Sequence, residues 1–174
     1  MDVSAFCTQS NVLIVAGKGG VGKTTMVAAL ARMAADEGLS VLVVELEGRR
    51  GITSAFGDSG DLGYAGTVLT AAGADDLDDP GSDETAMAGG TVHARMITPD
   101  DALLEYLADH GMRRMSKRLQ SSGVLDVVAS AIPGIKDILV LGKIKQLEQA
   151  SAAGKAGAHD LIVVDARGLP VFAR

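Results

Sequence analysis

The stretch "GKGGVGKTT", from Gly17 to Thr25, lies between an apolar run at residues 12–16 and a helix-like run at residues 24–37. Its four glycines relax the backbone restrictions that a Cβ imposes, so several backbone N–H groups can converge on one anion. A helix that starts directly behind the turn adds the positive end of its dipole. The turn therefore either provides flexibility alone or wraps a polyphosphate.

Three short apolar segments, at residues 12–16, 40–44 and 161–164, are rich in β-branched residues and predict buried parallel strands. Between the first two, residues 24–37 carry apolar side chains at helical spacing, and Gly38 follows as a natural helix end. Strand, glycine turn, helix and strand form a βαβ unit, which imposes a parallel sheet covered by helices. The expected fold class is therefore α/β, with a mainly parallel sheet flanked by helices.

The middle of the chain is less regular. The acidic stretch "GADDLDDPGSDET" lacks periodicity and predicts a flexible loop over residues 73–90. After this loop, "TVHARMI" predicts a weaker strand with Val92, Ala94 and Met96 on one face. The three histidines are scattered along the chain, with no spacing that would put two on one helix face, so no zinc site is expected.

Helical signals follow that strand. Thr98 can cap a helix whose first position is Pro99 and which runs to Gly111. Two further helical stretches are predicted at residues 112–120 and 124–131, and a Pro-Gly pair then breaks the chain.

Composition limits the class of protein. The 174 residues are 47% hydrophobic, which is enough for an aliphatic core in one domain spanning 1–174. No apolar run approaches the roughly 18 residues that cross a bilayer, so we expect a cytoplasmic protein. The single Cys7 cannot form an internal disulfide, and the net charge of -6 argues against binding to nucleic acid.

The glycine turn matches a phosphate-binding pattern. Gly17, Gly22, Lys23 and Thr24 satisfy G-x-x-x-x-G-K-[ST] between a strand and a helix, which favours this interpretation over a chance glycine turn. Lys23 would neutralise phosphate charge, and the Thr24 hydroxyl would bind Mg²⁺. The expected nucleotide contacts are Gly17, Gly19, Gly20, Val21, Gly22, Lys23, Thr24 and Thr25.

A second lysine, Lys18, marks a subclass of this pattern. "KGGVGKTT" resembles the deviant Walker A motif of the division-site-selecting, chromosome-partitioning, nitrogenase-iron-protein and anion-transporting ATPases. The resemblance implies a P-loop NTPase with ATP and Mg²⁺ as cofactors, in which Lys18 reaches the nucleotide of a partner subunit and is catalytic together with Lys23. A solvated loop charge is the alternative for Lys18.

A longer stretch, "TPDDALLEYLADHGMRRMSKRLQSSGVLDVVASAIPGIKDILVLGKIKQLE", resembles the anion-transporting subfamily. That group includes the arsenite-pump ATPase and the ATPase that delivers tail-anchored membrane proteins, and the bacterial homologues are most alike. The likeness covers most of the chain. It implies a homodimer, or a heterodimer with a paralogue, and a client that is an anion or a membrane protein.

Two acidic residues take roles from the same resemblance. In "VVELEGRRGI", Glu47 stands where the family has a first-switch Asp that orients the attacking water, although Gly48 replaces the usual proline. "HDLIVVDARGLPVFAR" opens like the family's Walker B strand, so Asp165 is expected to accept a Mg²⁺-bound water. A solvated turn for Glu47 and a strand-end cap for Asp165 are the alternatives.

Everything after Ala166 departs from the family pattern, and the second switch and later strands are missing. The expectation is therefore the N-terminal part of a single P-loop ATPase domain, with an incomplete sheet. The leading function is a Mg²⁺-dependent ATPase that couples hydrolysis to an anion or a hydrophobic protein client. A nucleotide-binding fragment or regulatory paralogue without activity is one alternative. A chromosome-partitioning ATPase is another, but it would be expected to have a basic surface.

Overall fold

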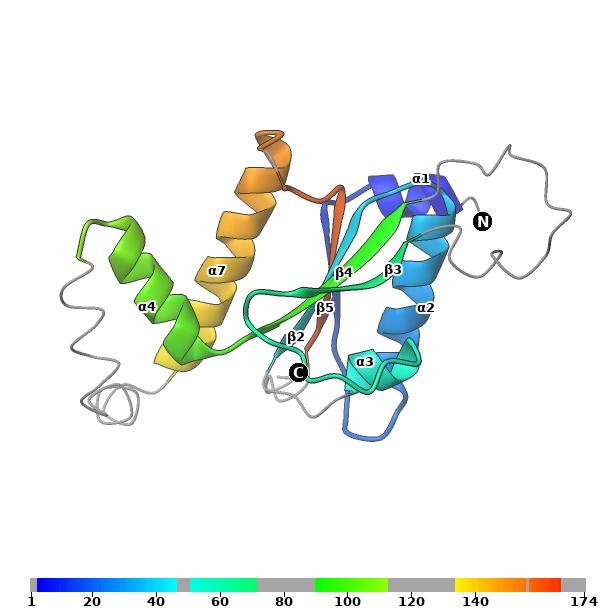
Figure 1. The fold of residues 1–174 in the computed structure, drawn as a ribbon, viewed down its shortest axis with the longest axis horizontal. Coiled ribbons are helices and arrows are strands. Elements are labelled where there is room, and N and C mark those ends of the chain that lie inside the picture. The colour runs from blue at the N-terminus through cyan, green and yellow to red at the C-terminus, as the bar shows by residue number, and fades with distance from the viewer. Residues whose placement is uncertain (1–2, 47–50, 72–89, 113–133, 156, 167–174) are drawn as a thin grey trace, which may run out of the picture.

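The computed structural model describes residues 3–46, 51–71, 90–112, 134–155 and 157–166, which contain one five-stranded sheet (Figure 1). The strand order is β1-β5-β2-β4-β3, and only β3 runs antiparallel to its neighbour. This confirms the α/β class and the mainly parallel sheet. The strands are β1 (Val12–Val15), β2 (Val41–Leu46), β3 (Thr67–Ala71), β4 (Thr91–Ile97) and β5 (Leu161–Asp165).

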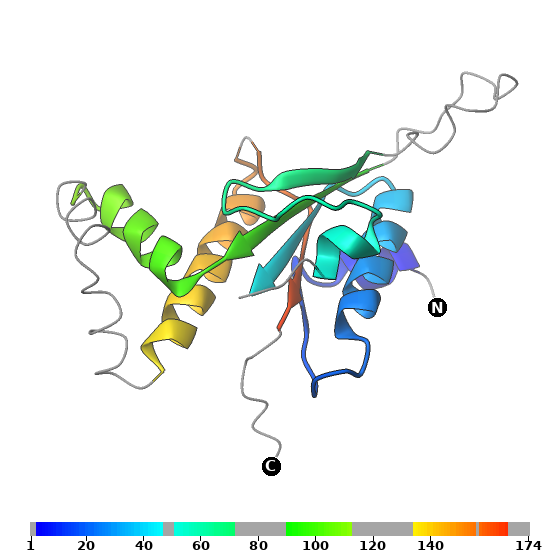
Figure 2. The same cartoon turned by 60° about the horizontal axis from the view of Figure 1, so that its bottom comes forward.

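Helices cover both faces of the sheet (Figures 1 and 2). One face packs against α1 (Val3–Thr8), α2 (Lys23–Asp36) and α3 (Gly51–Ala55), and the other packs against α4 (Pro99–Asp109) and α7 (Ile135–Ala152). Each face has its own aliphatic core. Within the described part of the chain, no helix combines the length and the apolar character needed to cross a membrane.

The strand predicted at residues 161–164 is β5, which has neighbours on both edges, because it pairs in parallel with β1 on one side and β2 on the other. Every residue of β2 and of β5 is buried, which explains their continuous apolar sequence. Among the described strands, β1 and β3 form the edges of the sheet, and Ile14 of β1 is 52% exposed.

The weaker strand prediction is confirmed as β4, which also acquires an antiparallel partner, β3, that the sequence did not reveal. Val92, Ala94 and Met96 share the α2 face as expected. The Thr98 cap is also confirmed, since its Oγ1 accepts a hydrogen bond from the Asp101 N–H at 3.1 Å. Of the loop predicted over 73–90 and the helix predicted over 112–120, all but the described residues 90 and 112 lie outside the described part of the chain, as does the helix predicted over 124–131.

A polar network fastens α4 and α7 to the sheet. The Glu105 carboxylate of α4 accepts a hydrogen bond from the Tyr64 hydroxyl and pairs at 2.7 Å with Nζ of Lys143, which is buried in α7. The Arg95 guanidinium of β4 stacks 4.4 Å from the centre of the Tyr64 ring. Burial alone would raise the pKa of Glu105, but hydrogen bonds from Lys143 and Tyr64 outweigh burial and lower it. Burial and the Glu105 hydrogen bond raise the pKa of Tyr64.

This network should contribute to stability in a pH-dependent way. Because the folded pKa of Glu105 lies below its usual value of 4.5, its contribution is present above that value and is lost as the pH falls through the folded pKa. We expect Glu105→Gln to lower the free energy of unfolding by about 1 kcal/mol at neutral pH, since the carboxylate is partly exposed. Urea unfolding at neutral and at acidic pH measures the difference.

The matched control is Glu148→Gln. Glu148 pairs with Lys145 at 2.9 Å on the exposed side of α7, where an ion pair contributes little. Equal losses in the two variants, or a Glu105→Gln loss that persists at acidic pH, would contradict the role of the network.

A close backbone contact fixes the start of β4. The Gly90 N–H donates to the Ala35 carbonyl at 2.8 Å, and a Cβ at Gly90 would lie 1.8 Å from the Leu39 carbonyl oxygen. Because this neighbour is backbone, it cannot move aside cheaply. We expect Gly90→Ala to lower the free energy of unfolding by about 1–3 kcal/mol in a denaturant titration, as in other overpacked sites. Gly63→Ala, where a Cβ meets no atom within 4 Å, should be nearly neutral, and equal effects would refute the argument.

Candidate functional site

The glycine turn connects the end of β1 at Val15 to the start of α2 at Lys23. Gly20 and Gly22 have φ values of 79° and 86°. These values lie in the left-handed region, which residues other than glycine rarely adopt. Gly22 is also the N-cap of α2 and supplies no side-chain cap. No side-chain oxygen of the N-cap therefore accepts from the first backbone N–H groups of α2. A helix start of this kind can bind an anion through those N–H groups.

The remaining loop residues have different constraints. A Cβ at Gly19 would meet no protein atom within 4 Å, so the protein itself does not require glycine there. A Cβ at Gly17 would contact the Val21 side chain at 3.4 Å. Val21 is 66% exposed and Thr25 is exposed on α2. Packing within the protein therefore does not explain the glycine at position 19, whereas the close approach of a ligand to the loop would.

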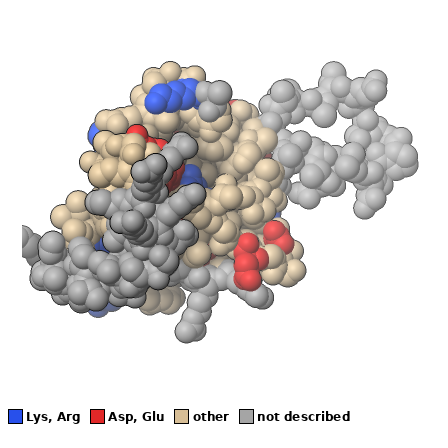
Figure 3. Space-filling view, turned by 60° about the vertical axis from the view of Figure 1, so that its left-hand side comes forward, with Lys and Arg blue, Asp and Glu red and all other residues tan. Residues whose placement is uncertain are grey.

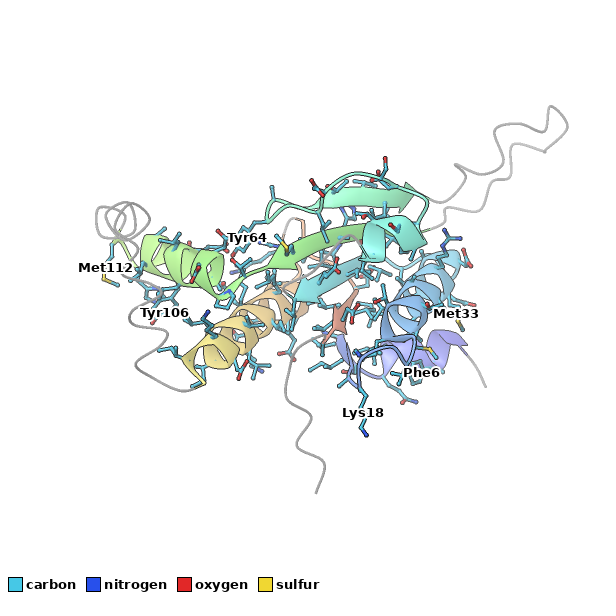
Figure 4. The ribbon with its side chains drawn as sticks, turned by 90° about the horizontal axis from the view of Figure 1, so that it is seen from below. Phe6, Lys18, Met33, Tyr64, Tyr106 and Met112 are labelled. Carbon is cyan, nitrogen blue, oxygen red and sulfur yellow. The ribbon has the colours of Figure 1, made fainter. Side chains whose placement is uncertain are left out.

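The two lysines of the turn behave differently. Lys23 is only 9% exposed, and its Nζ donates to the Lys18 carbonyl at 2.7 Å, which holds the ammonium group across the loop. Lys18 is exposed, and its side chain points away from the rest of the molecule (Figure 4). The structure therefore brings Lys23, but not the Lys18 ammonium, to the loop of its own chain.

Thr24 and Asp165 meet at the end of the sheet, although 141 residues separate them in sequence. The Thr24 hydroxyl donates to Oδ2 of Asp165 at 2.8 Å. Asp165 is fully buried at the end of β5, opposite Val15 of β1, and the next N–H, of Ala166, donates to the Val15 carbonyl at 3.1 Å. A hydroxyl and a carboxylate are the oxygen ligands that Mg²⁺ prefers, so this pair fits the metal that the sequence implies.

A second buried carboxylate lies beside this pair. Glu45 of β2 is 2% exposed and stands opposite Asp165 in the parallel register. Side chains alternate along a strand, so Glu45 and Asp165 both lie on the face covered by α2. Glu47, which was expected to orient water, lies outside the described residues.

The resemblance to the family places Glu45, together with Glu47, at the acidic positions of the first switch, but it implies a role in hydrolysis only for Glu47. The signal for Glu45 was a carboxylate within the otherwise apolar segment 41–46, a combination that is rare in a buried strand without a function. The structure places it at the carboxyl ends of neighbouring parallel strands, where ligands of α/β proteins bind.

The chain is similar in sequence to known ATPases. Residues 10–168 match the family model described as anion-transporting ATPase. The chain is 36% identical over 154 residues to ATPase BagA from Mycobacterium tuberculosis. It is equally similar to the Mb3704 protein of Mycobacterium bovis, whose name assigns it provisionally to the ATPases.

Each of these matches covers 88% of this chain and 41% of the relative, so the chain spans about two-fifths of the length of these curated relatives. The matched region contains the glycine turn, the Thr24–Asp165 pair and all five strands of the sheet. The chain therefore belongs to the anion-transporting ATPase family.

Proposed function

We propose that the chain binds Mg-ATP at residues 17–25 and takes part in its hydrolysis. The observation that carries this proposal is the hydrogen bond between Thr24 and Asp165, because it joins the helix behind the glycine turn to the acidic end of the neighbouring strand. In a P-loop ATPase the metal ion is held between the hydroxyl that follows the loop lysine and a carboxylate at the end of a neighbouring strand. A chance glycine turn gives no reason for a fully buried carboxylate beside it.

The residues of the site have distinct roles in this proposal. The Lys23 ammonium exchanges its bond to the Lys18 carbonyl for phosphate oxygens, and the backbone N–H groups of residues 19–25 hold the remaining charge. Thr24 would hold Mg²⁺ through its hydroxyl, and Asp165 would accept a hydrogen bond from a water bound to the ion. When bound, Mg²⁺ supplies charge neutralisation between the phosphate groups. Glu47 orients the attacking water.

Hydrolysis in this proposal needs two chains, in a homodimer or in a heterodimer with a paralogue. The support is the direction of Lys18, whose exposed side chain points away from its own loop (Figure 4) and is available to a partner's nucleotide. A second cation near the transferred phosphate stabilises the charge that spreads over its oxygens in the transition state.

The client that we propose is an anion or a hydrophobic protein, handled in the cytoplasm. The family description supports the anion. The surface of α4 and α7 supports the hydrophobic client, because Tyr106, Ile138 and Leu141 are 54%, 68% and 46% exposed. Figure 3 shows this side of the molecule, where Lys, Arg, Asp and Glu side chains also lie among the other residues.

Nucleotide binding should depend on Lys23. We expect Lys23→Ala to weaken Mg-ADP affinity at least about tenfold in calorimetry, because a charge-assisted contact to phosphate is lost. Lys136→Ala, which removes an exposed lysine of α7, is the matched control and should bind like the parent chain. Circular dichroism checks that both variants are folded. Equal affinity in Lys23→Ala and the parent would show that nucleotide binds elsewhere.

Turnover should depend on Lys18 and on protein concentration. We expect ATP hydrolysis per chain to rise with concentration and to fall by at least about a hundredfold in Lys18→Ala, whereas Mg-ADP affinity stays within about twofold. A phosphate-release assay across a dilution series measures this, again with Lys136→Ala as control. Turnover that is independent of concentration would refute the trans-acting lysine.

A further inference from the structure

A second polar cluster lies in the amino-terminal half of the parallel strands, at the end of the sheet opposite the glycine turn. The rings of His93 in β4 and His159 before β5 have centroids 4.8 Å apart. Nδ1 of His159 lies 2.9 Å from the Ser40 hydroxyl, which in turn lies 3.4 Å from the Thr91 hydroxyl. No local pattern in the sequence reveals this pair, because His93 lies in β4 and His159 lies just before β5, 66 residues apart by their numbers.

The two histidines line an open cavity of about 260 Å³. Arg95 and Thr67 add polar groups from the sheet, and Leu42 and Leu147 add apolar side chains to the lining. None of the residues that line it carries a carboxylate. The volume is slightly below the range of about 300–1,000 Å³ that holds drug-sized molecules, so the cavity suits a small group.

Arg95 gives the cavity a fixed positive charge. Its guanidinium stacks on Tyr64, and its buried Nε has no hydrogen-bond partner among the described residues. The carboxylates nearby have other partners. Asp160 accepts a hydrogen bond from the Ser40 N–H at 2.8 Å, and Glu105 is paired with Lys143 and Tyr64.

His159 responds to the same surroundings. Burial lowers its pKa first, the neighbouring His93 and Arg95 lower it further, and Asp160 partly opposes them. The imidazole is therefore held neutral at a pH where an exposed histidine would begin to gain a proton. An anion bound in the cavity would offset the repulsion from His93 and Arg95. It would therefore favour the protonated, positively charged form of His159.

We propose that the cavity binds a small oxyanion, a phosphate or carboxylate group, through Arg95, His93 and His159. A metal ion is the less favoured ligand, because the described residues contain no group of three or more His, Cys, Asp or Glu side chains that could hold one. The site is separate from the proposed ATP site, since parallel strands place the two at opposite ends of the sheet. Binding is linked to proton uptake, so affinity is higher at about pH 6 than at about pH 8.

Sulfate is the probe that tests this proposal, because its own charge does not change between these pH values. The chain has three histidines, so its imidazole NMR signals are few and each can be assigned from a single His→Gln variant. We expect sulfate at about pH 6 to shift the signals of His93 and His159 and to raise the pKa of His159. His110, whose Nδ1 lies 2.8 Å from the Tyr106 carbonyl, is the internal control and should not move.

These signals also separate the two sites, since sulfate at the glycine turn would leave the His93 and His159 signals where they are. Absence of a shift in both would overturn the proposal without any variant. Acetate and inorganic phosphate titrations then rank a carboxylate against a phosphate group.

Substitutions of Arg95 provide the second arm. Arg95→Gln should weaken sulfate binding at least about tenfold, and Arg95→Lys should retain part of it. The matched control is Arg32→Gln, because Arg32 also stacks on an aromatic ring, that of Phe56 at 4.9 Å, but on the other face of the sheet. Parent-like affinity in Arg95→Gln would overturn the proposal. If that variant fails to fold, His159→Gln decides, since it removes the group that takes up the proton and must weaken sulfate binding and flatten its pH dependence.

Discussion

The parallel pairing of β1 with β5 is the constraint on which the site depends. Its register sets Val15 opposite Asp165, so the loop that leaves β1 and the acid that ends β5 emerge at the same point. The hydrogen bond from Thr24 to Asp165 follows from that register, because α2 begins directly behind the loop. Pairing of β5 with β2 then adds Glu45 to the same end of the sheet.

This end of the sheet contains charges that the core does not need. Lys23, Glu45 and Asp165 are buried among strands that otherwise consist of aliphatic residues. Burying ionisable groups is unfavourable unless they gain partners, and apolar residues in their place would pack at no such cost. A concentration of buried charges at the carboxyl ends of parallel strands is typical of a ligand site.

The opposite face shows how the second cluster depends on the same sheet. β4 carries His93 and Arg95 toward α7 and then leads into α4, which the Tyr64–Glu105–Lys143 network attaches to the remaining structure. Arg95 belongs to both features, since it stacks on Tyr64 and lines the cavity. One strand therefore organises the cavity and the attachment of the helices beside it.

Sequence alone determined the elements whose signals are local. The glycine turn, α2, the Thr98 cap and the buried strands follow from residues close together in the chain, where spacing and turn chemistry decide the structure. The family could be predicted from motifs that resemble it, and the same motifs proposed Lys23, Thr24 and Asp165 as site residues, of which the structure brings Thr24 and Asp165 together. Strand β3 could not be predicted, because it is an edge strand among the described residues and its partner there is β4, a segment distant from local sequence patterns.

Only the tertiary structure decided which distant residues meet. The order of strands puts Asp165 beside the turn, sets Glu45 opposite it, and brings His93 against His159. The extent of β2 depends on the same order, because its last residues, Glu45 and Leu46, are held by pairing with β4. These contacts arise from hydrogen-bond registers between separate segments, and the continuous apolar runs of β2 and β5, buried at every residue, carry no alternation that would set the register.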